Sequence, residues 1–220
     1  MKRLLIFGTG AIGEVAHYYF SHDSDYTIAG FTADREYIKE ASFCGLPVVP
    51  LDEAIRSFPP NDTDMFVAMS YAKLNNVRKS KCDVATIMGY RLATYISSRA
   101  FVARGFTPGA NCFILEDNTI QPFARIGKNV TLWSGNHIGH HSMIGDHCFI
   151  ASHVVVSGGV VIGESSFIGV NAAIRDHVTI GPRCVIGAGA LILANADAEG
   201  VYLGQATERS KVPSSRLRRI

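Results

Sequence analysis

The clearest pattern in the chain is an aliphatic residue at every sixth position of its second half, with smaller and polar residues between. The series keeps its register without a slip: Ile114, Ile120, Ile126, Leu132, Ile138, Ile144, Ile150, Val156, Ile162, Ile168, Ile174, Ile180, Ile186 and Ile192. A hexapeptide period predicts a parallel β-helix. Three hexads then form one triangular coil, and successive coils lie about 4.8 Å apart with the aliphatic side chains pointing inward.

Two other positions repeat with this series. A glycine often follows the aliphatic residue directly, and a small residue usually precedes it by two positions. We expect the small residue to fit a tight corner and the glycine to adopt turn dihedrals that other residues resist. Cys112, Cys148 and Cys184 are spaced by two coils, so they are expected to form one internal column of small fillers.

The first 90 residues show a different pattern. Residues 2–7, 26–32 and 64–70 resemble buried strands, and residues 14–21 and 72–81 resemble helices. Strands that alternate with helices predict a parallel sheet with right-handed crossovers. We therefore predict an α/β, Rossmann-like domain before the β-helix.

The predicted domains follow from these two patterns. The Rossmann-like domain takes residues 1–90, the β-helix takes residues 91–207, and residues 208–220 form a basic, solvated tail.

Composition adds only exclusions. The net charge of +2 gives no electrostatic footprint for nucleic acid. No apolar run approaches the roughly 20 residues of a membrane span. The five cysteines include no CxxC pair, which is typical of reduced thiols in a cytoplasmic protein.

A glycine-rich motif, Gly8-Thr9-Gly10-Ala11-Ile12-Gly13, lies between the first strand and the first helix. Such a loop holds phosphates at a helix N-terminus and by itself suggests NAD, with Asp34 at about the spacing of a ribose-binding carboxylate. A full dinucleotide fold needs two such halves, however, and this domain is too short to hold both.

Five histidines cluster in the β-helix: His137, His140, His141, His147 and His153. Histidine can act as a general base near neutral pH. The alternative is zinc, because γ-class carbonic anhydrases use a similar helix with two ligands at H-x4-H spacing. No two of these five histidines are five or eighteen residues apart, which disfavours zinc.

The whole pattern resembles the left-handed β-helix acyltransferases, and in particular the family of sialic acid O-acetyltransferases and bacillosamine-pathway nucleotide-sugar N-acetyltransferases. The stretch Gly139-His140-His141-Ser142-Met143-Ile144-Gly145-Asp146 matches the catalytic turn of that family. The resemblance implies a left-handed helix, a homotrimer with active sites between neighbouring subunits, and acetyl-CoA lying along the groove between them.

The resemblance also implies roles for the residues of that turn. His140 matches the catalytic base, and His141 stands where family members often have a carboxylate, which leaves Asn136 or Asp146 as candidates to orient His140. His137 is a candidate for substrate binding or for capping a turn. The N–H of Gly158 is the candidate oxyanion donor, although Gly158 could equally serve only to form a corner.

By the same match, the residues expected to bind CoA are Phe149, Gly158, Val170 and Ala188. Those expected to hold the nucleotide-sugar are Gly10, Ala11, Ile12, Asp34, Ser70 and His137. The Gly-x-Pro-Ala ending of the family appears here as Gly204-Gln205-Ala206-Thr207, without the proline.

The sequence therefore predicts a cytoplasmic, metal-independent N-acetyltransferase that uses acetyl-CoA and acts on a nucleotide-linked amino sugar, such as a 4-amino-4,6-dideoxyhexose, in bacterial glycan or O-antigen biosynthesis. One alternative is O-acetylation of a sialic-acid-like sugar by the same base. Another, of a different class, is a binding or assembly module without turnover.

Overall fold

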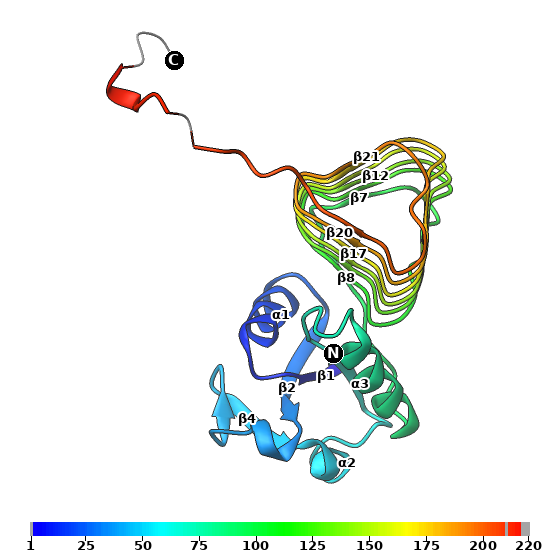
Figure 1. The fold of residues 1–220 in the computed structure, drawn as a ribbon. Helices are drawn as coiled ribbons and strands as arrows, with labels where there is room; N and C mark the ends of the chain where they lie inside the picture. Colours follow the sequence, from blue (N-terminus) through cyan, green and yellow to red (C-terminus); the bar gives the residue numbers. More distant parts are fainter. Residues whose placement is uncertain (1, 210, 217–220) are drawn as a thin grey trace.

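The structure is a computed structural model that describes residues 2–209 and 211–216. Figure 1 shows an α/β domain lying against one face of a triangular parallel β-helix, with the C-terminal segment leaving the far end of the helix.

The α/β domain is built on a sheet of strand order β3-β4-β2-β1-β5, in which only the β3–β4 pair is antiparallel. Its strands are β1 (Lys2–Phe7), β2 (Tyr26–Ala33), β3 (Ser42–Phe43), β4 (Leu46–Pro50) and β5 (Thr63–Val67). Its helices are α1 (Ala11–His22), α2 (Ala54–Ser57) and α3 (Asn76–Ile87), and short 3-10 turns span Arg35–Tyr37, Leu51–Glu53 and, near the C-terminus, Ser214–Arg216. Side chains of β1 and β5 fill the core on both faces of the sheet.

Two predicted boundaries in this domain were wrong. The strand predicted at 64–70 ends at Val67. The helix predicted at 72–81 begins only at Asn76, because Lys73, Leu74 and Asn75 have positive φ values of 49°, 48° and 65° and form a turn before it. Strands β3 and β4 were not predicted, since prolines within β4 weaken the strand signal.

The β-helix has three faces within the described residues. The seven-stranded face consists of β6 (Tyr95–Ile96), β8 (Phe113–Ile114), β11 (Thr131–Leu132), β14 (Phe149–Ile150), β17 (Phe167–Ile168), β20 (Val185–Ile186) and β22 (Val201–Tyr202). The six-stranded face consists of β7 (Phe101–Val102), β9 (Thr119–Ile120), β12 (His137–Ile138), β15 (Val155–Val156), β18 (Ala173–Ile174) and β21 (Leu191–Ile192). The four-stranded face consists of β10 (Arg125–Ile126), β13 (Met143–Ile144), β16 (Val161–Ile162) and β19 (Thr179–Ile180).

The six-residue series is confirmed as the internal column of each face. Every one of its fourteen aliphatic residues is buried, and the most exposed of them, Ile192, is only 7% exposed. Strands pair in register with those one coil away, as Ile138 does with Ile120 and Val156. The predicted column of Cys112, Cys148 and Cys184 is also confirmed, because all three thiols are fully buried in the same core.

The expected reason for the glycines was wrong. The glycine after each aliphatic residue does not have a positive φ; those values occur two residues later, as at Asn129 (55°), His141 (59°) and Asn171 (57°). The glycine is needed because the next coil lies so close. A Cβ on Gly139 would lie 2.5 Å from the backbone carbon of Ser157, and one on Gly163 would lie 2.4 Å from the backbone nitrogen of Pro182.

The seven-stranded face carries the contact with the α/β domain (Figure 1). The ring of Phe113 on β8 lies 5.2 Å from that of Phe66 on β5 and 5.9 Å from that of Tyr19 on α1. The hydroxyl of Tyr19 donates to Glu116 at 2.6 Å. The six-stranded and four-stranded faces, and the corner between them, therefore stay on the side away from the domain.

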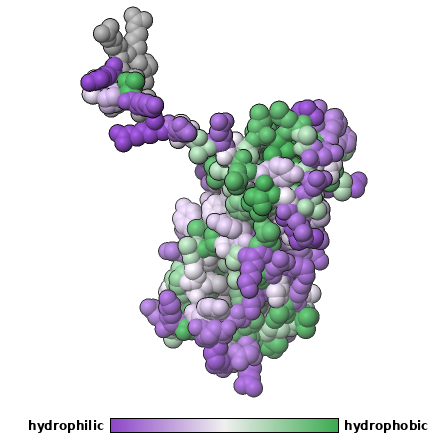
Figure 2. All heavy atoms as spheres, in the orientation of Figure 1, coloured by the Kyte–Doolittle hydropathy of each residue, from purple (hydrophilic) through white to green (hydrophobic). Residues whose placement is uncertain are grey.

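The C-terminal end of the β-helix exposes apolar side chains. Figure 2 shows hydrophobic residues gathered on this end of the molecule. Leu191, Leu193, Val201 and Leu203 are between 50% and 81% exposed. A face of this kind is typical of a surface that another chain covers.

Candidate active site

His140 lies at the corner between the six-stranded and the four-stranded faces, in the turn that links β12 to β13. Its backbone N–H donates to Oε1 of Gln121, one coil earlier, at 2.9 Å. Its carbonyl oxygen accepts from the N–H of Gly159, one coil later, at 2.9 Å. The backbone of His140 is thus fixed from both sides, while its side chain is exposed.

The two nitrogens of the His140 ring have different surroundings. Nδ1 lies 3.1 Å from Nδ1 of His141. The other edge lies against Gly158, since a Cβ built on that glycine would be 2.7 Å from both Cε1 and Nε2 of His140. Gly158 therefore provides the space that lets the imidazole lie over the next coil.

The N–H of Gly158 is available to a ligand. Within the described residues it donates to no protein acceptor, whereas its carbonyl accepts from the N–H of His177 at 3.0 Å. The base edge of His140 and an unused backbone donor therefore lie together at one exposed corner. This is the arrangement that acyl transfer requires, with a base beside a donor for the oxyanion.

Neither residue suggested to orient His140 contacts it. The Asn136 side chain is 1% exposed; its Nδ2 donates to the carbonyl of Trp133 and its Oδ1 accepts from the N–H of Val154 at 2.8 Å. Asn136 therefore stabilises the coil. Asp146 lies at another corner, where it accepts from the N–H of Lys128 at 2.9 Å. His137 is half-buried on the outer side of β12.

The glycine-rich loop forms the start of α1. Gly10 is the N-cap, no side chain caps the helix, and a Cβ on Gly10 would meet no atom within 4 Å. Ala11 and Ile12 form the first turn. Gly13 packs against the loop, because a Cβ there would lie 2.1 Å from the carbonyl oxygen of Gly8. The loop thus offers helix N–H groups to an anion.

A cavity of about 320 Å³ opens beside this loop. It is lined by Thr9, Tyr37, Ile38, Lys39, Glu40, Ser42, Phe43 and Val48. Aromatic and aliphatic walls with one nearby cation suit a base and its phosphates. Apart from Thr9 of the glycine-rich loop, sequence reasoning did not find these residues, because they come from β3, β4, a 3-10 turn and the segment between them, which were not predicted.

Asp34 does not face this cavity. Its carboxylate is paired with Nζ of Lys81 at 2.6 Å, and both side chains are largely buried, at 23% and 21% exposed. Asp34 instead lines a separate, shallower depression with Arg35 and Leu51. The carboxylate of Asp34 is thus already paired within the domain, and its expected part in holding the nucleotide-sugar stays a prediction.

The prediction for Phe149 was wrong. Phe149 is 4% exposed and lies under the loop after β5, where the ring of Tyr71 is 5.0 Å away and the guanidinium of Arg78 is 5.7 Å away. It is therefore not open to CoA in this chain. Ser70 precedes Tyr71 in the same exposed loop. Val170 and Ala188 are exposed, one coil apart, at the corner between the seven-stranded and six-stranded faces.

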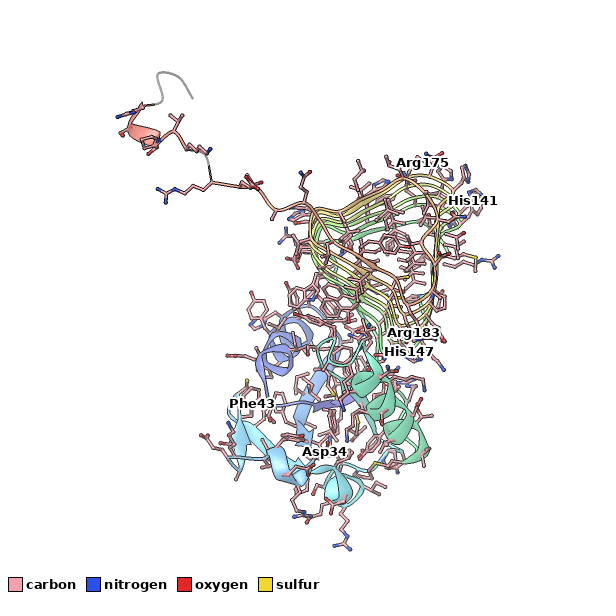
Figure 3. The ribbon with its side chains drawn as sticks, viewed as in Figure 1. Asp34, Phe43, His141, His147, Arg175 and Arg183 are labelled. Carbon is pink, nitrogen blue, oxygen red and sulfur yellow. The ribbon has the colours of Figure 1, made fainter. Side chains whose placement is uncertain are left out.

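Within one chain the structure brings Ile12 of the glycine-rich loop close to Phe149, because both line one small pocket between the α/β domain and the β-helix. It does not bring the cavity beside the loop to the corner that carries His140. Figure 3 shows His141 at the corner of the β-helix that points away from the α/β domain, whereas Phe43, beside the cavity, lies at the far side of that domain.

Within the described residues, no group of three or more histidine, cysteine or acidic residues is placed to hold a metal ion. No helix in the described part of the chain is long and apolar enough to cross a membrane.

Comparison with known proteins places this geometry in context. The family model described as bacterial transferase hexapeptide (six repeats) matches residues 123–158 and 159–194. No curated protein sequence matches the chain.

Solved structures match nearly the whole chain. The acetyltransferase domain of PglB from Neisseria gonorrhoeae is 22% identical, with a TM-score of 0.82, and the match covers 93% of this chain and 97% of that one. PerB from Caulobacter crescentus, solved with CoA and GDP-perosamine, is 23% identical, with a TM-score of 0.81 and coverage of 93% and 95%. WeeI from Acinetobacter baumannii is 18% identical, with a TM-score of 0.67 and coverage of 93% and 97%. These matches establish the fold, an α/β domain followed by a left-handed β-helix, as predicted.

Proposed function

We propose that the chain is an acetyl-CoA-dependent N-acetyltransferase that acts on a nucleotide-linked amino sugar in the bacterial cytoplasm, for glycan or O-antigen assembly. One observation carries the proposal. Nε2 of His140 lies against Gly158, whose backbone N–H has no protein acceptor within the described residues. The domain that accompanies this corner has a loop and a cavity suited to a nucleotide.

The proposed reaction is a direct transfer. The sugar amine attacks the thioester carbonyl, so a C–N bond forms and the C–S bond breaks. Nε2 of His140 takes the proton that the amine loses, and that proton passes to the departing thiolate or to water. The N–H of Gly158 donates to the oxyanion of the tetrahedral intermediate. No step requires a metal ion.

The proposed substrates follow from both surfaces and from the solved neighbours. The PerB structure holds CoA and GDP-perosamine, an amino sugar on a nucleotide. We place the phosphates at Gly10, Ala11 and Ile12, where the N-terminus of α1 is uncapped, and the base in the adjoining cavity. We place CoA along Gly158, Val170 and Ala188; Val170 and Ala188 are exposed on the β-helix and Gly158 is half-buried.

A homotrimer is part of the proposal. The corner that carries His140 and Gly158 (the transfer corner) and the cavity beside the glycine-rich loop, lined by Phe43 (the loop cavity), lie on opposite sides of one chain (Figure 3). The six-stranded face exposes apolar residues that a neighbour could cover: Phe101, Val155 and Leu191 are 63%, 43% and 65% exposed. Closed cyclic symmetry would bring the corner of each subunit to the α/β domain of the next.

A thiol-release assay tests the reaction. The protein is mixed with acetyl-CoA and UDP-, dTDP- or GDP-linked 4-amino-4,6-dideoxy sugars, with His140→Ala as the control. Release with an amino sugar that the variant abolishes supports N-acetyl transfer. Release only with hydroxyl acceptors such as sialic acids would reassign the chain to O-acetylation. No release with either set would favour a binding or assembly module.

Subunit complementation tests the shared site. Gly10→Phe should block the loop without a clash, because nothing lies within 4 Å of a Cβ there. His140→Ala and Gly10→Phe are inactive alone by this proposal. Equal co-expression should restore about a quarter of the wild-type activity, since one site in four would then combine an intact corner with an intact loop. Activity that stays absent in the mixture would contradict a site formed between chains.

A further inference from the structure

We propose that His141 is the positioning residue for His140, and that it fixes the tautomer of the base through a single proton shared between the two Nδ1 atoms. This inference rests on the proposed function for its kinetic consequences, but its structural content can be tested without activity. It gives a role to the position at which this chain has a histidine instead of an acid.

The contact itself dictates the proton count. Two imidazole nitrogens 3.1 Å apart form a hydrogen bond only if one carries a proton and the other does not. If Nδ1 of His140 is the donor, Nε2 of His140 is unprotonated and can act as a base. If Nδ1 of His141 is the donor, neutral His140 carries its proton on Nε2 and cannot accept the proton of the amine.

The surroundings of His141 favour its role as the acceptor. Its ring packs on that of Phe123, with centroids 4.7 Å apart, and its backbone N–H donates to the carbonyl of Pro122. The ring is therefore held on the preceding coil, with its Nδ1 turned toward His140 and its remaining edge exposed to water. Nε2 of His141 can then keep its own proton in contact with solvent, which leaves Nδ1 as the acceptor.

No other charged group at this corner takes the place of His141. The corner carries no charged residue on the preceding coil (121–123) or on the following coil (157–159), and Arg175, Asp176 and His177 stand two coils later. Asp176 lies 3.9 Å from Nε2 of His177, and the ring of His177 lies over Gly159. Within the described residues, neither His140 nor His141 contacts a carboxylate. His141 is therefore the group that can orient the base.

The pair should also respond to acid differently from a histidine–carboxylate pair. A carboxylate raises the pKa of a neighbouring histidine, because an opposite charge favours the protonated ring. A neutral imidazole raises it less, and a second proton on the pair would place two cations side by side. The base should thus remain unprotonated to a lower pH than it would with an acid at position 141.

The backbone at position 141 allows a clean set of variants. His141 has a φ of 59°; the same turn position is held by Phe123 at 67° one coil earlier at this corner, and by Asn129 at 55° at another corner. Phenylalanine and asparagine therefore both fit this conformation in this protein. His141→Phe removes the acceptor and keeps the ring, whereas His141→Asn restores an acceptor that does not titrate in this range. His141→Glu supplies the carboxylate.

The first test is the tautomer of His140, measured by ¹⁵N NMR of the imidazole nitrogens in the full-length protein. Peaks are assigned with His140→Asn and His141→Phe, and circular dichroism checks that the variants fold. We expect His140 to be protonated on Nδ1 in the wild type and to lose that preference in His141→Phe. Protonation of neutral wild-type His140 on Nε2 would overturn the proposal, whether or not the protein shows transferase activity.

The second test uses thiol release with the accepted sugar across pH 5 to 9. We expect His141→Phe to lower kcat roughly 10- to 100-fold with the KM for acetyl-CoA unchanged, because general-base catalysis contributes factors of this order. His141→Asn should recover most of kcat, and His141→Glu should move the acid limb of the profile to higher pH. Activity equal to that of the wild type in all three variants would overturn the role of His141. Failure of the proposed function would instead appear as no thiol release by the wild type.

Discussion

Arg78 on α3 reaches into the β-helix, where its Nη1 donates to Oγ1 of Thr131 at 2.8 Å. Its Nη2 donates to the carbonyl oxygens of Asn129, His147 and Cys148 at 3.1 to 3.3 Å. The side chain is 1% exposed, and burial lowers its pKa to about 10. A single guanidinium therefore satisfies several carbonyls of two coils and ties the α/β domain to the helix.

Arg78→Met should lower the free energy of unfolding by about 3 kcal/mol, because the carbonyls of Asn129 and His147 would remain buried without donors. Arg99→Met is the matched control, since Arg99 pairs with Asp117 on the surface with side chains 69% and 59% exposed. It should cost less than about 1 kcal/mol. Urea unfolding of both variants measures the difference. Equal losses would show that the buried contacts do not hold the domains together.

Gly158→Ala should keep the fold and lose activity. Its Cβ would meet the His140 ring at 2.7 Å, and a side chain can turn aside where a backbone cannot. Displacing the base should lower kcat by about 100-fold. Gly139→Ala is the contrast, because its Cβ would meet the backbone of Ser157 at 2.5 Å and should destabilise the coil. Thermal unfolding and thiol release together distinguish the two variants. A fully active Gly158→Ala enzyme would show that activity does not depend on the placement of the His140 ring over Gly158.

Asp23 links the end of α1 to the first coil and should make stability depend on pH. It accepts from the Tyr95 hydroxyl at 2.6 Å and from the N–H of Ser98 at 2.9 Å. The hydrogen bond from Tyr95 is the largest cause that holds the pKa of Asp23 below its ordinary value of 3.8. A lowered carboxyl pKa adds stability above 3.8, and this stability is lost as the pH falls through the folded-state value.

Asp23→Asn should therefore unfold at a lower urea concentration than the wild type at pH 7. The difference between the two urea midpoints should narrow as the pH falls below 3.8. Asp25→Asn, in the exposed turn two residues on, serves as the control. A difference in urea midpoint that stays constant from pH 7 to pH 3 would mean that the carboxylate charge of Asp23 adds nothing to the free energy of unfolding.

The cysteines should divide into one reactive and four protected thiols. Cys44 is exposed, whereas Cys82, Cys112, Cys148 and Cys184 are buried. Burial raises the pKa of the Cys112 and Cys148 thiols to about 12. Titration of native protein with a chromogenic disulfide should therefore modify Cys44 alone at first, and all five thiols in denaturant. Fast modification of more than one native thiol would contradict the closed core. Thiol-release assays with such a reagent should use Cys44→Ser.

The sequence predicted the β-helix well because its signal is local and repeated. Each hexad places one aliphatic residue inward, so Ile138 and Val156 reveal their position without knowledge of the rest of the fold. The placement of His140 at a corner followed from the same register. Contacts between coils did not, and the glycine at 139 was given a conformational role although its true constraint is the closeness of Ser157.

Contacts between the two domains were the least predictable part. Phe149 was expected to bind CoA, but it lies beneath Tyr71, because its face of the helix is covered by the α/β domain. The sequence did contain a signal that this face is covered. Phe113, Phe149 and Phe167 project outward at multiples of the coil length on one face, and an aromatic column of that kind is typical of a covered surface.

The separation of the transfer corner from the loop cavity has a consequence for how such a protein can diversify. If the cavity holds the acceptor as proposed, substitutions in its walls, such as Tyr37 or Phe43, would change which acceptor is held without touching the turn that carries His140. Because the two surfaces belong to different elements and, by the proposed function, meet only across chains, each could vary on its own. The arrangement would let one catalytic solenoid be reused for many sugars by exchange of the small domain that presents them.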